Sequence, residues 1–291
     1  MIADHRPAAS VSRIAGARRR AGFALALAGL AGVVHAEQKP LWEFGLGAGA
    51  VTFPDYRGSD RTQTYPLPVP YFVYRGEFLK ADRNGVRGRF FDSDRVELNV
   101  SMSASAPVDS KDNPTREGMP DLNPTVEIGP SLDINLWRTA DRRTKLDLRL
   151  PLTTGVTIEG SPRSTGWSFS PRLNVDLQDV GGMAGWNMGL LAGPLFGDRK
   201  QHEYFYSVAQ QYATAERPAY EARRGYAGTQ MLMSLSKRFP SFWVGGFLRY
   251  DTLRGAVFAD SPLVRRNNYM AGGLALSWII GESSRMVEVS D

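Results

Sequence analysis

Two long segments of strictly alternating polarity limit what this chain can fold into. From Val96 to Ala106 apolar residues occupy the even positions and polar residues the odd ones, and the alternation returns from Val126 to Leu136. Successive side chains of a strand point to opposite faces of a sheet, so each segment predicts a strand with one apolar face. A strand that is tilted in the membrane needs about 9–11 residues to cross the bilayer, whereas strands usually have about 5–6 residues. Both segments therefore predict membrane-spanning strands.

The start of the chain, residues 1–36, has the features of a cleaved secretory signal peptide. Arginines at positions 13, 18, 19 and 20 precede an apolar run over 21–34, and small residues lead to a cleavage site after Ala36. A spanning helix needs about 20 apolar residues, more than this run has. The consecutive arginines also suggest a twin-arginine signal, but the general secretory route is favoured because the apolar residues expected in register are missing.

Removing the leader changes the charge of the chain. It holds five of the 35 lysines and arginines and one of the 30 acidic residues, so residues 37–291 have a formal net charge of +1. No basic stripe remains to suggest a nucleic-acid partner. Cysteine is absent, which excludes disulfides and a lipid-anchored cysteine. Because the mean hydropathy is −0.29 and no long apolar run follows the leader, a soluble sandwich and a membrane barrel are the remaining fold classes.

The alternation predicts about twelve strands, an even number, as bacterial single-chain barrels have. The predicted strands are 41–53, 65–75, 77–83, 85–91, 95–106, 125–137, 144–157, 166–179, 185–197, 225–238, 241–254 and 268–280. Short connections at 92–94, 138–143, 180–184 and 239–240 alternate with mostly long ones at 55–64, 107–124, 160–165, 197–224 and 256–267. This parity is typical of short periplasmic turns and long extracellular loops. We therefore predict an all-β fold, a transmembrane antiparallel up-and-down β-barrel.

The two faces of the predicted strands suggest different roles. Five of the six tryptophans fall beside the short connections, where an aromatic girdle at the membrane interface is expected: Trp42, Trp137, Trp186, Trp243 and Trp278. The polar faces carry charges of both signs that we expect to face the lumen: Glu97, Glu127, Asp133, Asp147, Arg149, Arg172 and Asp176. The mixture of signs argues against a strongly ion-selective pore.

Motifs for catalysis or cofactor binding are weak. The glycines at positions 45, 47 and 49 fit a loose dinucleotide fingerprint, but no helix follows, so close strand packing is the favoured interpretation. His202 is the one histidine after the leader, with Ser207 and Glu203 nearby in the 197–224 loop. We expect a solvated loop histidine rather than a hydrolase triad. The sequence thus predicts no enzyme, no cofactor and no metal site.

The long loops contain apolar residues as well as polar ones. Met119, Leu122, Leu263 and Val264 are placed to fold their loops back over the barrel mouth, although variable surface loops explain the composition equally well. The sequence leaves open whether the lumen is plugged.

Several segments resemble the MipA/OmpV family of outer-membrane proteins, named for an MltA-interacting protein. The segments are 54–59 (PDYRGS), 68–71 (PVPY), 116–120 (REGMP) with 126–130 (VEIGP), 218–220 (PAY) with 225–226 (GY), and 259–263 (ADSPL). The resemblance implies a non-enzymatic scaffold that links a lytic transglycosylase with a penicillin-binding protein in the periplasm; other members are more similar to porin-type, adhesion or antigenic proteins. One departure is the tail, 281–291, which we expect to be periplasmic and which follows the residues where such barrels usually end.

The sequence therefore predicts a Gram-negative outer-membrane barrel over residues 37–291, in contact with outer-membrane lipid. A scaffold for peptidoglycan enzymes is the favoured function. The alternatives are a porin-like channel for small solutes and, less favoured, a hydrolase at the outer rim.

Overall fold

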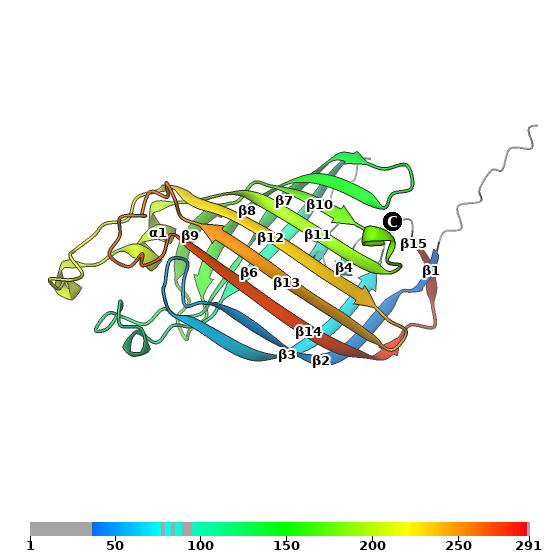
Figure 1. Cartoon of the computed structure of the whole chain (residues 1–291), viewed down its shortest axis with the longest axis horizontal. Helices are drawn as coiled ribbons and strands as arrows, with labels where there is room; N and C mark the ends of the chain where they lie inside the picture. The colour runs from blue at the N-terminus through cyan, green and yellow to red at the C-terminus, as the bar shows by residue number, and fades with distance from the viewer. Residues whose placement is uncertain (1–36, 77–78, 83–84, 89–94, 290–291) are drawn as a thin grey trace, which may run out of the picture. The chain divides into compact units, whose positions relative to one another are not determined.

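The structure, a computed structural model, describes residues 37–76, 79–82, 85–88 and 95–289 (Figure 1). The strands are β1 (Glu37–Pro40), β2 (Trp42–Pro54), β3 (Thr62–Arg75), β4 (Leu79–Asp82), β5 (Gly85–Gly88), β6 (Val96–Ser105), β7 (Thr125–Arg138), β8 (Thr144–Thr157), β9 (Ser164–Phe169), β10 (Arg172–Leu177), β11 (Trp186–Gly197), β12 (Gly225–Arg238), β13 (Phe242–Thr252), β14 (Asn268–Glu282) and β15 (Met286–Val289). The described helices are α1 (Arg199–Tyr206) and the short 3-10 turns η1 (Ser110–Asp112), η2 (Val180–Gly182) and η3 (Gln210–Tyr212). The predicted signal peptide, the turn at 92–94 and parts of the strands predicted at 77–83 and 85–91 lie outside the described residues.

The strands β2 to β14 form one antiparallel sheet in up-and-down order. Its hydrogen-bonded order is β5-β4-β3-β2-β14-β13-β12-β11-β10-β8-β7-β6, so the first long strand pairs with the last one. The ends of this order, β5 and β6, are consecutive in the chain and lie beside each other. The fold is therefore an antiparallel up-and-down β-barrel, as the alternation predicted.

The prediction of one strand at 166–179 is wrong, because the chain divides it into β9 and β10 at Ser170 and Pro171. Pro171 has no amide hydrogen for a ladder, and the Ser170 amide donates to the Pro151 carbonyl at 3.2 Å. Both short strands pair with β8 and β11. They consequently occupy one position in the sheet, and the twelve-position order is kept.

The end of the chain contains structure that the alternation did not predict. β14 continues to Glu282, past a register shift between Ile279 and Gly281. β15 then pairs antiparallel with β1 in a separate two-stranded sheet. These strands have four residues each, too few for a pattern of period two to stand out.

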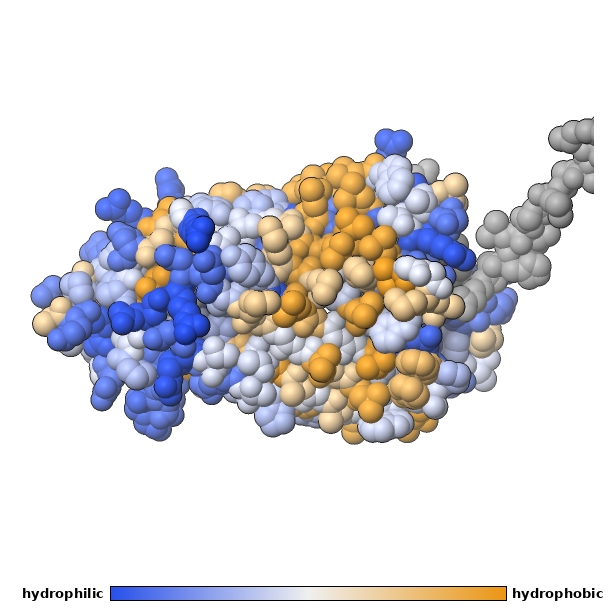
Figure 2. Space-filling view, in the orientation of Figure 1, coloured by the Kyte–Doolittle hydropathy of each residue, from blue (hydrophilic) through white to orange (hydrophobic). Residues whose placement is uncertain are grey.

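Exposed apolar side chains cover the outer face of the barrel. They include Phe44, Leu46, Phe72, Met102, Ile128, Leu152, Leu173, Met231, Met233, Leu248, Met270, Leu274 and Ile280. Figure 2 shows apolar residues gathered between two more hydrophilic regions. The buried strand residues are mostly polar, among them Glu43, Asn99, Asp147, Asn174, Asp251 and Ser277. This arrangement inverts that of a soluble protein, and an apolar surface of this extent is typical of a site of membrane contact.

Candidate functional site

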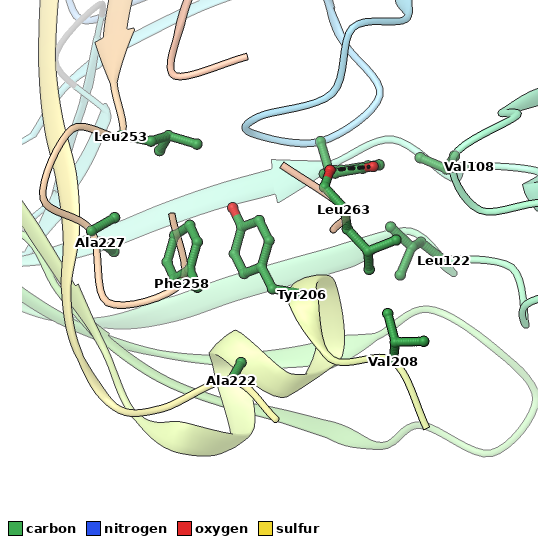
Figure 3. Close-up of a cluster of buried hydrophobic side chains, with 11 residues drawn as sticks. Val108, Leu122, Tyr206, Val208, Ala222, Ala227, Leu253, Phe258 and Leu263 are labelled. Atoms are coloured by element: carbon green, nitrogen blue, oxygen red, sulfur yellow. Dashed lines mark hydrogen bonds between the residues drawn. The ribbon is translucent and has the colours of Figure 1, made fainter. Parts of the chain in front are cut away.

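The long loops at one end of the barrel pack into a common core, here called the loop cap. Its buried apolar residues come from several loops and from the adjoining ends of β12 and β13: Tyr56, Val108, Leu122, Tyr206, Val208, Ala222, Ala227, Leu253, Ala256, Phe258 and Leu263 (Figure 3). Segments from four different loops thus share one hydrophobic cluster. Such burial is the main stabilising term for a compact unit.

Helix α1 places an aromatic residue at the centre of the loop cap. The Asp198 carboxylate caps the helix by accepting a hydrogen bond from the Gln201 amide at 2.8 Å. At the other end of the helix, the Tyr206 ring stacks on Phe258 with centroids 3.7 Å apart. The Tyr206 hydroxyl donates to the Arg57 carbonyl, and the Ser261 hydroxyl donates to the Tyr206 carbonyl. Three loops are thereby joined through one side chain.

Buried polar groups tie the remaining loop segments to the same core. The Arg116 guanidinium donates to the Pro120 carbonyl at 3.0 Å and lies over the Tyr56 ring. Asn113, fully buried, donates to the Asp55 carboxylate at 2.8 Å. Buried polar groups that are satisfied in this way fix one arrangement of the loops.

The apolar loop anchors proposed from the sequence take part in this core. Leu122 and Leu263 are buried, and Met119 and Val264 pack against the cluster. Of the two alternatives, loops folded over the mouth and variable surface loops, the structure supports the first. The core rests on Ala227 and Leu253 at the ends of β12 and β13, so the loop cap lies over this end of the barrel.

His202 is fully buried, so the expectation of a solvated loop histidine is wrong. The sequence predicts a long polar loop at 197–224, but α1 turns the imidazole into the core, where it packs edge-on against Phe258. Its Nδ1 bonds to the Arg223 carbonyl. The Glu203 carboxylate is paired with Arg199, and the Ser207 hydroxyl accepts from the Ala222 amide. The three side chains proposed for a triad therefore have separate partners.

Four of the charges predicted to face the lumen form one network. Asp147 is 2% exposed, and the Arg149 guanidinium lies 3.3 Å from Asp176, 3.6 Å from Asp133 and 3.8 Å from Asp147. Asn99, Asn135 and Asn174 each donate to one of these carboxylates. Neighbouring amides and one shared cation thus offset the cost of holding three acids together.

The other three charges predicted to face the lumen lie outside this network. Glu127 accepts hydrogen bonds from the Thr153 and Ser168 hydroxyls. Arg172 lies beside Arg149 in the ladder between β10 and β8, and Glu97 lies opposite Asp133 in the ladder between β6 and β7.

Two further buried carboxylates were missed. Glu43 pairs with Arg75 at 2.9 Å and with Arg238 at 3.1 Å near the short turns. Asp251, fully buried, pairs with Arg249 at 2.8 Å and with Arg57 of the loop cap at 3.2 Å. Both acids occupy the polar parity of predicted strands, so the alternation was a signal that could have identified them.

The predicted girdle is divided between the two faces of the sheet. Trp42, Trp137 and Trp278 are exposed, and Trp186 is half-buried with the Lys237 ammonium 5.9 Å from its ring. Trp243, in contrast, shares the inward parity of Asp251 and lines an interior cavity, so its assignment to the girdle is wrong. Its indole occupies space left by Gly245, where a β-carbon would overlap the ring. A missing neighbouring side chain thus allows an aromatic ring to point inward.

The cavity next to Trp243 has a volume of about 300 Å³. Its lining combines small and apolar residues, such as Val51, Val69 and Phe247, with polar residues that include Asp176. The glycines that suggested a dinucleotide fingerprint belong to the adjacent wall. A β-carbon on Gly47 would overlap the Leu276 carbonyl of β14, which supports the interpretation of close strand packing.

The described residues contain neither a candidate membrane-spanning helix nor a candidate metal site. Among them, no helix has both the length and the apolar character to cross a membrane. In the same part of the chain, no group of three or more histidine, cysteine or carboxylate side chains is placed to hold a metal ion.

Solved structures offer only distant similarities. A bacterial polysaccharide outer membrane secretin matches with a TM-score of 0.39 and 9% identity, covering 83% of this chain and 99% of that one. The Pseudomonas putida toluene transporter TodX matches with a TM-score of 0.27 and 10% identity, covering 84% and 68%. These scores are too low to indicate a function. No curated protein matches the chain.

The family comparison is more informative. The family model described as MltA-interacting protein MipA matches residues 46–280, which include every strand from β3 to β13 and all of the loop cap. The match covers most of the chain, and it agrees with the segments that suggested this family from the sequence. The chain belongs to the MipA family.

Proposed function

We propose that this protein is a non-enzymatic outer-membrane barrel that holds a lytic transglycosylase at the periplasmic, short-turn end. The family match carries the proposal, because the family is described as MltA-interacting. The family and the barrel together support an outer-membrane β-barrel protein, and we propose that it is exported with cleavage of the leader after Ala36.

The two ends of the barrel differ in a way that favours the short-turn end for a partner. At the long-loop end, the buried apolar loop residues pack against one another in the loop cap, so they do not form a surface for a partner. At the other end, β15 carries Met286, which is exposed, and the β1–β15 sheet has no third strand within the described residues. A free sheet edge can add a strand from a partner. Short turns alone offer little area against the roughly 1,200–2,000 Å² of a stable interface.

The proposed assembly includes a second enzyme. A penicillin-binding protein that binds the same barrel, or the transglycosylase on it, would bring synthesis and cleavage of peptidoglycan together. Because each contact is small, we expect binding to be multivalent, and two weak contacts on one scaffold raise the effective concentration of each partner.

A retention experiment with the purified barrel, immobilised in detergent, tests the scaffold function. We expect it to retain a lytic transglycosylase from a periplasmic extract above the level retained by an unrelated barrel. Val287→Pro, which removes a backbone donor from β15, should weaken retention. Val264→Ala in the loop cap is the matched control and should leave it unchanged. Equal retention by the unrelated barrel contradicts the scaffold.

The interior cavity favours a second candidate, a channel for small solutes. The cavity is bounded by strand residues, and the loop cap lies over one end of the barrel. Planar-bilayer recording separates the two functions. A scaffold with a filled lumen should show no steady conductance, whereas a conducting intact barrel supports the channel.

A further inference from the structure

Four exposed arginines lie at the long-loop ends of three neighbouring strands. This arginine row consists of Arg224 before β12, Arg254 after β13, and Arg265 and Arg266 before β14. Figure 2 shows strongly hydrophilic residues over this end of β13 and β14. β12 pairs with β13, and β13 pairs with β14, so the strand ends that carry the four residues are neighbours in the sheet.

Two of these arginines flank the last backbone hydrogen bond between the β13 and β14 segments. Thr252 pairs with Asn268 at the end of the β13–β14 ladder, and the Leu253 amide continues it by donating to the Asn267 carbonyl at 2.7 Å. Arg254 and Arg266 follow on either side. Two guanidinium groups that flank the same strand ends repel each other, so this arrangement is unfavourable without an anion.

Nearby protein groups do not supply that anion. Among the described residues, the four side chains of the arginine row form no ion pair with a carboxylate. Asp260 accepts a hydrogen bond from the Tyr220 hydroxyl at 2.6 Å. The backbone nevertheless holds the arginines in place, because the amides of Arg265 and Arg266 both donate to the Gly58 carbonyl. The row is thus a group of positive charges that forms no ion pair with a carboxylate in the part of the chain that the structure describes.

The outer face below the arginine row changes polarity in steps. On β14 the outward residues run from Leu274 and Met270, both exposed, to Asn268, and the exposed Arg266 lies two residues before this strand end. On β13 they run from Leu248 through Tyr250 to Thr252, and the exposed Arg254 lies in the turn that follows. The Tyr250 hydroxyl bonds to Asn268 at 3.1 Å. Along the strands the side chains thus change from apolar groups to hydroxyl and amide groups and then to guanidinium groups. This order matches the depth profile of a membrane from acyl chains to charged headgroups.

We propose that the arginine row binds the phosphate groups of an anionic, phosphorylated glycolipid in the membrane leaflet at the long-loop end. Guanidinium groups bind phosphate through paired, charge-assisted hydrogen bonds, and one phosphate bridging Arg254 and Arg266 removes their mutual repulsion. Acyl chains of the same lipid lie along Leu248, Met270 and Leu274. The inference rests on the proposed outer-membrane location, because that location supplies the lipid.

Binding of defined lipids to the folded barrel tests the site. The full mature chain in detergent is titrated with bisphosphorylated lipid A, with its monophosphorylated form and with phosphatidylethanolamine, and bound lipid is counted by native mass spectrometry. We expect affinity to fall in that order, and Arg254→Gln with Arg266→Gln to weaken binding of the bisphosphorylated lipid by about tenfold. Arg199→Gln with Lys200→Gln removes the same charge from α1 and should have no effect.

Three outcomes overturn the proposal: equal binding of the neutral lipid, equal loss in the control variant, or no loss in the arginine variant. The proposal is also overturned if inorganic phosphate, at the same concentration as the lipid, displaces bound bisphosphorylated lipid A. That result shows a general anion site. Arg254→Lys with Arg266→Lys keeps the charge but not the paired geometry, and it should bind with intermediate affinity. Fractionation of cell envelopes tests location separately, so a barrel absent from the outer membrane refutes the proposed function without touching the lipid-binding result.

Discussion

His202 illustrates how one buried titratable side chain affects the loop cap. Burial lowers the pKa of the imidazole below its ordinary value of 6.5, and the positive charge of Arg57 acts in the same direction. The Arg223 carbonyl and the Asp198 carboxylate act against this shift. Because desolvation is the largest cause, the neutral imidazole is the form that the packed core favours.

The lowered pKa predicts that acid loosens the loop cap. Below about pH 6.5 the opened cap binds a proton at His202 more readily than the packed cap, so the free energy of opening falls as the pH falls. Amide hydrogen exchange in residues 199–224, corrected for intrinsic rates, should therefore be faster near pH 5.5 than near pH 7.5. His202→Gln cannot titrate and should remove this difference. The same pH dependence in the variant contradicts the assignment.

Leu263 tests the apolar part of the same core. It is fully buried, so Leu263→Ala should make opening of the loop cap easier by about 2–5 kcal/mol. Hydrogen exchange should rise throughout the loop cap and stay unchanged in β2 and β14. Leu274→Ala deletes the same atoms from an outward side chain that is 75% exposed, and it should leave the cap protected. Equal deprotection in both variants contradicts a shared loop core.

At the scale of single strands, the fold depends on close approach between β2 and β14. Gly47 faces the backbone of Leu276, so Gly47→Val should disrupt the ladder that joins the first and last long strands. The cost of overpacking is roughly 1–3 kcal/mol or more. The folded fraction after refolding into detergent, measured by its shifted mobility on unheated gels, should fall. Ala48 points outward, so Ala48→Val should refold as the parent does. Equal folded fractions of the Gly47→Val and Ala48→Val variants contradict the close packing.

Strand positions were predictable from the sequence because period-two polarity is a local signal. It identified strands at every position of the sheet and placed Asp147, which is buried, on the polar face. It missed α1, whose eight residues alternate in no simple way, although the Asp198 cap was a usable signal. The girdle assignment placed Trp243 on the wrong face because it relied on the position of Trp243 beside a short connection. Such a position does not specify which face a side chain occupies, whereas the even spacing between Trp243 and Asp251 does.

The loop cap was less predictable, for a physical reason. Its core joins Tyr56, Leu122, Tyr206 and Leu263, which are far apart in sequence, and no local pattern indicates which loops meet. Composition alone left folded and variable loops equally favoured. The pairing of Asp251 with Arg57 across the loop cap and the barrel likewise depends on tertiary packing.

For the whole molecule, the central claim is that the apolar outer face lies in lipid while the polar face encloses the interior. The chain has no cysteine, so single cysteines can be introduced without background. Leu274→Cys is on the outer face, and Ser277→Cys is on the buried inner face three residues further along β14.

The most direct measurement is fluorescence quenching of a probe on each cysteine by brominated lipids in reconstituted bilayers. Folding of each labelled variant is checked first by its mobility on unheated gels. A lipid-facing outer wall around a polar interior predicts strong quenching at position 274 and little at position 277. Equal quenching at the two positions, or none at 274 in the folded barrel, contradicts it.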